Sequence, residues 1–199
     1  MIPRYKIPEI EKIWSDENKF KIWTEIECLI AEQLSKIGKI PKKAAKEIKS
    51  KAKFNIKEIE RIEKDTKHDF VAYINNVSSY IGESSKYFHY GVTSSDIIDT
   101  CFSVQLRDTG NILLTQLNNL VKILKKQSLK YKNTLMIGRS HGIHAEPITF
   151  GLKLSSFYFE FKRNLKRLDN AIQEISICIA LDYGVTCSAI GRLKCSTPS

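Results

Sequence analysis

Hydrophobic residues recur at helical spacing along almost the whole chain. Between residues 16 and 37 they lie three or four positions apart, at Phe20, Trp23, Ile26, Ile30, Leu34 and Ile37. Such spacing places them on one face of a helix. Asp16 and Glu17 put negative charge at the start of this segment, and Gly38 is the residue type that commonly follows a helix end. The pattern predicts a long amphipathic helix over residues 16–37.

The same period predicts several more helices. A lysine-rich helix follows Pro41, and residues 55–80 are expected to form a helix or a pair of helices. The run Thr93-Ser94-Ser95-Asp96 matches the capping box that starts a helix, which we expect to continue through Leu106. Residues 112–129 again carry an apolar face and predict a separate helix.

The last long helix has the most regular pattern. Its apolar residues alternate steps of four and three, at Leu154, Tyr158, Phe161, Leu165, Leu168, Ile172 and Ile175. A heptad stripe of this kind packs against a partner helix. The polar segment 138–147 before it is expected to be a loop, because no strand-like alternation occurs before residue 176. We predict an all-α fold, with an N-terminal helical domain over residues 1–111 and the beginning of a helical bundle over residues 112–175.

Residues 176–199 have a different character. They contain three charged residues and three of the five cysteines, and the heptad stripe stops before them. This shift of composition predicts a divergent tail, which a frameshift in the gene would explain.

Composition narrows the class of protein. With 42% hydrophobic residues the chain can bury a core, and it has no apolar run long enough to predict a membrane span. The N-terminal residues lack the apolar segment of a secretory signal, so we expect a cytoplasmic protein. The five cysteines are odd in number and irregularly spaced, which favours reduced thiols over disulfides. The sequence contains no Cys-x-x-Cys pair, so the ligand spacing typical of a zinc site is missing.

The net charge of +10 comes mainly from lysine, which supplies 25 of the 32 basic residues. A basic face can bind nucleic acid or attract a small polyanion. Residues 42–57 hold seven lysines but only one aromatic residue, Phe54, whereas proteins that bind single-stranded nucleic acid combine basic and aromatic side chains. A solvated helical surface is the favoured interpretation, and a basic helical nucleic-acid-binding protein is the alternative.

All four histidines lie in three short polar segments. The first is Lys67-His68-Asp69, where the lysine can hold an anion and the histidine can relay protons near neutral pH. A solvated helix face explains this segment equally well. In the second, His89 and Gly91 precede the hydroxyl residues Thr93 and Ser94 at a predicted helix start, where free backbone N–H groups bind anions.

The third segment runs from Gly138 to Pro147 between two apolar helices. It contains four side chains able to carry charge or transfer protons, at Arg139, His141, His144 and Glu146. An imidazole near a carboxylate is a tuned acid or base, so this composition favours a functional site over a plain connector.

These segments resemble the signature segments of adenylosuccinate lyase. Residues 89–96 and 139–151 are similar to two of them, residues 67–72 to a third, and the opening Arg4-Tyr5 to the family's N-terminus. Related lyases of the fumarase and aspartase superfamily share the fold but not this Thr-Ser-Ser-Asp and Ser-His-Gly-Ile-His pairing. The resemblance implies a fumarase/aspartase-like helical fold.

The resemblance also implies roles for individual residues. His141 matches the general acid that protonates the leaving nitrogen, and His68 is the second expected catalytic histidine. The remaining expected substrate-binding residues are Arg4 and Tyr5 for the nucleotide, Thr93 and Ser94 for the succinyl carboxylates, and Lys67, Asp69 and His89 in the same pocket.

The implied reaction is β-elimination of fumarate from adenylosuccinate, giving AMP, and from SAICAR, giving AICAR, in purine nucleotide synthesis. The resemblance implies no metal or organic cofactor, and a homotetramer whose sites combine several subunits. It assigns the base to a serine on a loop that these 199 residues do not include. We therefore expect a truncated copy that lacks activity alone; a non-catalytic partner of a full-length lyase is a further alternative.

Overall fold

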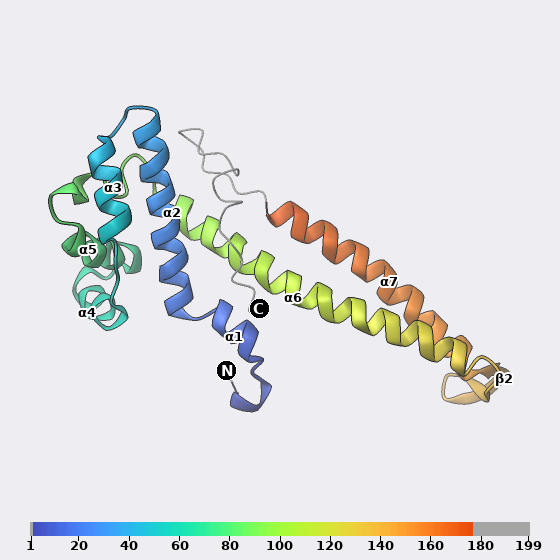
Figure 1. Cartoon of the computed structure of the whole chain (residues 1–199). Coiled ribbons are helices and arrows are strands. Elements are labelled where there is room, and N and C mark those ends of the chain that lie inside the picture. The colour runs from blue at the N-terminus through green and yellow to red at the C-terminus, as the bar shows by residue number, and fades with distance from the viewer. Residues whose placement is uncertain (1, 177–199) are drawn as a thin grey trace. The chain divides into compact units, whose positions relative to one another are not determined.

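The computed structural model describes residues 2–176 (Figure 1), so the predicted tail lies almost entirely outside the described residues. The helices are α1 (Pro8–Ile13), α2 (Asp16–Lys36), α3 (Lys42–Lys51), α4 (Ile56–Thr66), α5 (Asp69–Ile81), α6 (Ser94–Lys130) and α7 (Phe150–Ile175). Two 3-10 turns, η1 (Pro3–Tyr5) and η2 (Gly82–Tyr87), and two strands, β1 (Leu135–Ser140) and β2 (Ile143–Thr149), complete the described chain. The predicted helical fold class is confirmed.

Contacts divide the described chain into two compact units, residues 2–106 and residues 107–175. Unit 1 holds α1 to α5 and the start of α6. Unit 2 holds the remainder of α6, the two strands and α7.

The core of unit 1 is rich in aromatic side chains. Phe20 and Trp23 of α2 lie against Phe70 and Tyr73 of α5, with ring centroids 4.9 Å apart for Trp23–Phe70 and 5.7 Å apart for Phe20–Tyr73. All four side chains are buried. The Tyr73 hydroxyl lies 3.0 Å from the hydroxyl of Thr24, which gives its buried oxygen a partner.

Helix α6 differs from the prediction of two helices separated near residues 107–111. It runs without interruption from Ser94 to Lys130. The glycine at position 110 does not end the helix, because it is a contact point for α7. A Cβ built at Gly110 would lie 2.6 Å from Cγ1 of Ile172, so the missing side chain lets the two helices pack closely.

The segment predicted as a loop, residues 138–147, lies largely in a β-hairpin. Strands β1 and β2 pair antiparallel, with Leu135 opposite Thr149 and Ser140 opposite Ile143. The prediction failed because no residue of either strand is buried, so no buried face imposes an alternating sequence. A register shift between Ile137 and Arg139 further breaks the alternation.

The lysines of residues 42–57 lie on the surface of unit 1. Every lysine in this range is exposed, and Lys49 pairs with Glu32 at 2.5 Å. Cys28 and Cys101 are free thiols, and burial raises the pKa of each to about 12. Within residues 2–176, no helix is both long and apolar enough to cross a membrane.

A pair of glycine substitutions tests the packing of α6 against α7. A Cβ at Gly151 would lie 2.4 Å from the backbone oxygen of Ser128 and 2.6 Å from Cα of Lys132, neither of which can rotate away. We expect Gly151→Ala to lower the thermal midpoint, measured by circular dichroism, as overpacking costs about 1–3 kcal/mol. Gly110→Ala meets side-chain atoms of Ile172 and no backbone atom, so we expect it to lower the midpoint by a smaller amount. Equal midpoints for both variants would contradict this account.

Candidate active site

The junction between α4 and α5 positions the first histidine segment. Lys67 ends α4 in the left-handed conformation, with φ 54°, and His68 is the N-cap of α5. The Val71 N–H donates to Nδ1 of His68 at 3.4 Å, and the Asp69 carboxylate lies 3.5 Å from the same nitrogen. Nδ1 can accept from the Val71 N–H only when it carries no proton, whereas it can donate to the Asp69 carboxylate only when it carries one. The two contacts therefore compete. The His68 side chain is 52% exposed and is available to a ligand.

His89 follows η2 and is also left-handed, with φ 58°. Its Nδ1 lies 2.6 Å from Oε1 of Glu27, and its backbone N–H donates to Oε2 of the same carboxylate at 3.2 Å. The ring packs against Phe70, with centroids 4.9 Å apart. His89 is thereby held by two helices of unit 1.

A capping box consists of two reciprocal hydrogen bonds between side chains and backbone N–H groups, and the start of α6 forms one of them. The Thr93 backbone N–H donates to Oδ2 of Asp96 at 2.9 Å. Thr93 is exposed and Ser94 is half-buried. Burial raises the pKa of Glu27, while its pairing with His89 opposes that effect and the nearby Asp96 charge adds to it.

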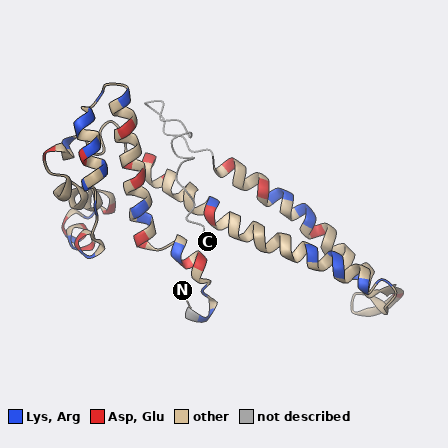
Figure 2. Ribbon diagram, in the orientation of Figure 1, with Lys and Arg blue, Asp and Glu red and all other residues tan. Residues whose placement is uncertain are grey.

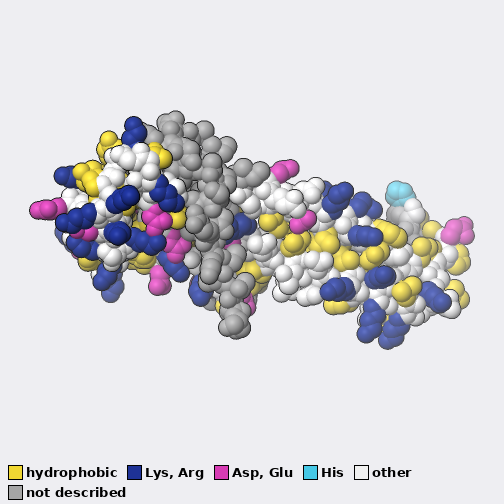
Figure 3. Space-filling model, turned by 45° about the horizontal axis from the view of Figure 1, so that its top comes forward, with side chains coloured by type: hydrophobic (Ala, Val, Ile, Leu, Met, Phe, Trp, Pro, Cys, Tyr) yellow, Lys and Arg dark blue, Asp and Glu magenta, His cyan; other side chains and the backbone are white. Residues whose placement is uncertain are grey.

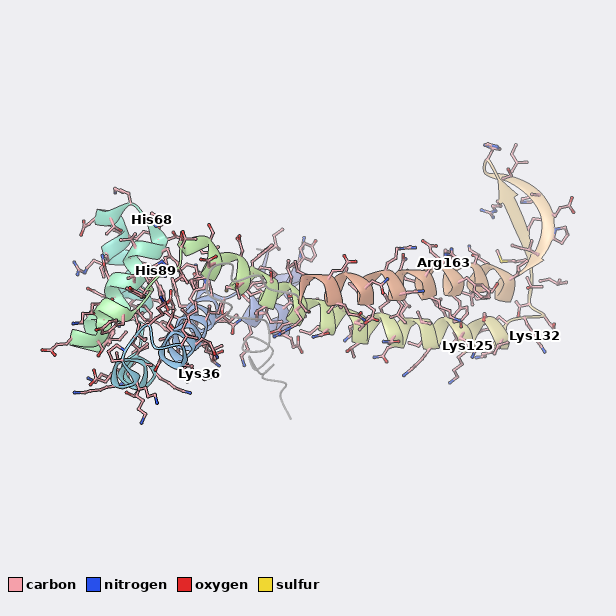
Figure 4. The ribbon with its side chains drawn as sticks, turned by 90° about the horizontal axis from the view of Figure 1, so that it is seen from above. Lys36, His68, His89, Lys125, Lys132 and Arg163 are labelled. Atoms are coloured by element: carbon pink, nitrogen blue, oxygen red, sulfur yellow. The ribbon has the colours of Figure 1, made fainter. Side chains whose placement is uncertain are left out.

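The structure brings two of the three histidine segments together in unit 1. Phe70 links them, because it follows Asp69 in α5 and its ring contacts His89. Figure 4 shows His68 and His89 in the same region of the unit. Thr93 and Ser94 follow His89 by four and five residues in the chain.

Arg4 and Tyr5 lie in the η1 turn of unit 1. The Arg4 guanidinium lies over the Tyr5 ring, 4.9 Å from its centroid, and both side chains are exposed. In the described part of the chain these two side chains contact each other and not His68 or His89. Their expected nucleotide contact stays a prediction.

His141 lies at the tip of the hairpin in unit 2. It forms a two-residue turn with Gly142, and both have positive φ, 52° and 77°. Such turns favour asparagine followed by glycine, so a histidine at the first position is unusual. His144 stands opposite Arg139 in the strand register, and all three side chains are exposed. The expected general acid therefore belongs to a different unit from His68 and His89.

Three residues other than glycine have positive φ in residues 2–176: Lys67, His89 and His141. Each was a candidate site residue from the sequence. The left-handed conformation costs roughly 1–2 kcal/mol for a residue with a side chain, and such strain concentrates at functional sites. This coincidence supports all three candidates independently of their side-chain chemistry.

Glu27 is the site residue that the sequence analysis missed. Its side chain is buried and both of its oxygens bind His89. The available signal was its place on the apolar face of α2, four residues after Trp23 and three before Ile30. A carboxylate there requires a partner, which charge counting alone does not reveal.

The sequence matches the protein family described as Lyase over residues 4–181. The chain belongs to this lyase family. It is 46% identical over 177 residues to adenylosuccinate lyase of Bacillus subtilis, covering 89% of this chain and 41% of that protein. It is 40% identical over 192 residues to adenylosuccinate lyase of Thermotoga maritima, covering 96% of this chain and 43% of that protein.

Solved structures of two enzymes share the fold of this chain. A fumarate lyase from Mesorhizobium matches with TM-score 0.80 and 24% identity, over 93% of this chain and 44% of that one. A β-carboxy-cis,cis-muconate cycloisomerase from Acinetobacter calcoaceticus matches with TM-score 0.81 and 25% identity, over 94% of this chain and 45% of that one. The chain thus spans about two fifths of the length of the curated relatives it matches.

Replacing Lys67 by glycine tests the backbone strain at the site. Glycine adopts the left-handed conformation at the end of a helix without a steric penalty. We expect Lys67→Gly to raise the free energy of unfolding by about 1 kcal/mol in urea titrations. Lys64→Gly, three residues earlier within α4, should lower it by a similar amount, because glycine destabilises a helix interior. A lower free energy of unfolding in Lys67→Gly would contradict this expectation, because it would show that the Lys67 side chain contributes more to stability than its backbone strain costs.

Proposed function

We propose that this chain is part of an adenylosuccinate lyase, which eliminates fumarate from adenylosuccinate to give AMP and from SAICAR to give AICAR. The observation that carries the proposal is that His89 and His141 have left-handed backbone conformations and that the side chains of His68 and His141 are exposed. The two named relatives, at 46% and 40% identity, support the substrate class. A purine biosynthetic enzyme of this kind works in the cytoplasm.

The elimination needs an acid at the leaving nitrogen. We assign this role to His141, whose place at an exposed two-residue turn leaves both ring nitrogens accessible. Histidine suits the role because its unperturbed pKa lies near neutral pH. The Nδ1 of His68 caps a helix, so Nε2 is the nitrogen we assign to contact the substrate.

The intermediate carbanion and the succinyl carboxylates need positive partners. Thr93 and Ser94 lie at the N-terminus of α6, where backbone N–H groups and the helix dipole favour an anion. Lys67 adds a cation at an exposed turn near His68. These groups act by stabilising charge in the transition state.

The proposal also includes assembly of several copies into a tetramer. Unit 2 buries few side chains, whereas the apolar residues it exposes include Leu113, Leu120, Ile123, Leu129, Leu152, Phe157 and Phe159. Figure 3 shows hydrophobic side chains along the α6–α7 pair between lysine and arginine side chains. Two helices cannot bury both of their apolar faces against each other alone, and a second copy offers the matching apolar surface.

The basic surface of unit 2 is compatible with an anionic substrate. Lysine and arginine occur along the second half of α6 and the middle of α7 (Figure 2), among them the labelled Lys125 and Arg163 of Figure 4. Residues 107–175 hold twelve basic and five acidic residues. This charge also suits nucleic acid, so the salt dependence of DNA binding separates the two functions: a steep slope favours nucleic acid.

Ligand binding and turnover test the proposed function separately. We expect the purified 199-residue chain to bind AMP in calorimetric titrations and to release no fumarate from adenylosuccinate, because the expected serine base is not among its residues. His68→Ala should weaken AMP binding, whereas Lys64→Ala, on an exposed turn of α4, should not. Robust fumarate release by the chain alone would contradict the assignment of the base, and no binding of AMP would contradict the site.

Charge substitution on α6 tests the assembly. Leu113 is 45% exposed, and we expect Leu113→Glu to shift the chain to a smaller mass in sedimentation velocity, since a buried carboxylate without a partner opposes association. Asn111→Glu makes the same charge change on a different face of α6 and is the control. A monomeric wild-type chain, or equal masses for all three, would refute self-association through this face.

A further inference from the structure

Glu27 is an unusual residue for its position. Among the carboxylates of residues 2–176 it alone is buried, with 1% of its surface exposed. Its neighbours on α2 include the buried side chains of Trp23, Ile26 and Ile30. Burying a carboxylate without compensation is strongly unfavourable, so the fold must use both of its oxygens.

Both oxygens of Glu27 bind one residue, His89, 62 positions away in the chain. Oε1 pairs with the ring Nδ1 at 2.6 Å, and Oε2 accepts the backbone N–H at 3.2 Å. One carboxylate thus fixes both the ring and the backbone of His89. The second contact also explains how the left-handed backbone, with φ 58°, is held in place.

The contact at Nδ1 decides which ring nitrogen is left for a ligand. When one ring nitrogen donates to a carboxylate, it carries the proton, and the other is left with its lone pair in the neutral ring. In the described residues no hydrogen bond engages Nε2 of His89, and the side chain is 21% exposed. The Phe70 ring packs against the His89 ring, with centroids 4.9 Å apart, and restricts rotation of the His89 ring about its Cβ–Cγ bond.

The other groups around Glu27 do not compete for this contact. Asp96 is a second carboxylate nearby and has the same charge, so it cannot donate to Glu27 when ionised. Tyr73 and Cys28 also lie near Glu27, and burial raises the pKa of both, so both keep their protons at neutral pH. The Tyr73 hydroxyl is engaged by Thr24.

We propose that Glu27 is a positioning residue that holds the His89 ring in the tautomer protonated at Nδ1, so that Nε2 accepts a hydrogen bond from a hydroxyl or N–H group of the nucleotide. The place of His89 in the substrate site rests on the proposed function. The tautomer itself does not, because the Glu27 contact sets it in the ligand-free chain.

Nitrogen NMR on the ¹⁵N-labelled chain tests the tautomer directly. At pH 8, two-bond ¹H–¹⁵N correlations should show His89 protonated at Nδ1, with the signal assigned by its absence in His89→Gln. In Glu27→Leu the preference for Nδ1 should be lost. Glu25→Leu removes an exposed carboxylate two residues earlier on α2 and should leave the tautomer unchanged. A proton on Nε2 in the wild-type chain would overturn the proposal.

A second variant covers the case in which Glu27→Leu does not fold. Glu27→Gln keeps the side-chain volume but offers one acceptor oxygen for two donors, so it should also reduce the fraction protonated at Nδ1. An unchanged tautomer in a folded Glu27→Gln chain would overturn the positioning role. A purely structural role would lower the thermal midpoint without changing the tautomer.

AMP titration separates this inference from the proposed function. Loss of one well-aligned hydrogen bond corresponds to about tenfold weaker binding, and we expect that change in Glu27→Leu but not in Glu25→Leu. Unchanged affinity together with a shifted tautomer would refute the contact between Nε2 and the nucleotide. Failure of the wild-type chain to bind AMP would count against the proposed function, and the tautomer measurement would still decide on Glu27.

Discussion

Aromatic packing between α2 and α5 determines where the candidate site residues of unit 1 lie. Trp23 and Phe20 contact Phe70 and Tyr73, and the Phe70 ring also packs against the His89 ring. Because Phe70 directly follows Asp69, a shift of this core would move both histidine segments. Large apolar residues buried against one another resist such shifts, since a core packed at crystal density has few alternative arrangements. The positions of the two histidine segments of unit 1 therefore depend on the packing of the α2–α5 core.

The helices that could be predicted are those whose buried residues recur at a regular helical spacing. The helix predicted over residues 16–37 corresponds to α2, and the heptad stripe from Leu154 to Ile175 corresponds to α7 with partly or fully buried side chains at every stripe position. Gly110 shows the limit of such reasoning. Sequence alone treats a glycine in a helical pattern as a weak point, whereas here the close approach of Ile172 requires it. Only the tertiary contact distinguishes the two cases.

The features that escaped prediction depend on contacts distant in sequence or on backbone conformation. The hairpin has exposed strands and a register shift, so its residues carry no alternating burial pattern. Glu27 was hidden for a related reason, because its partner is 62 residues away. The left-handed conformations of Lys67, His89 and His141 could not be predicted, because residues other than glycine seldom adopt them. Residue chemistry selected these segments as candidates, and the structure added their backbone conformations and their partners.

The candidate site residues are divided between the two units. His68, His89, Thr93 and Ser94 belong to unit 1, and His141 belongs to unit 2. Unit 2 exposes apolar side chains on both of its helices, such as Leu113 on α6 and Phe159 on α7, and has little core of its own. The proposed assembly would give unit 2 the burial that its own two helices do not provide.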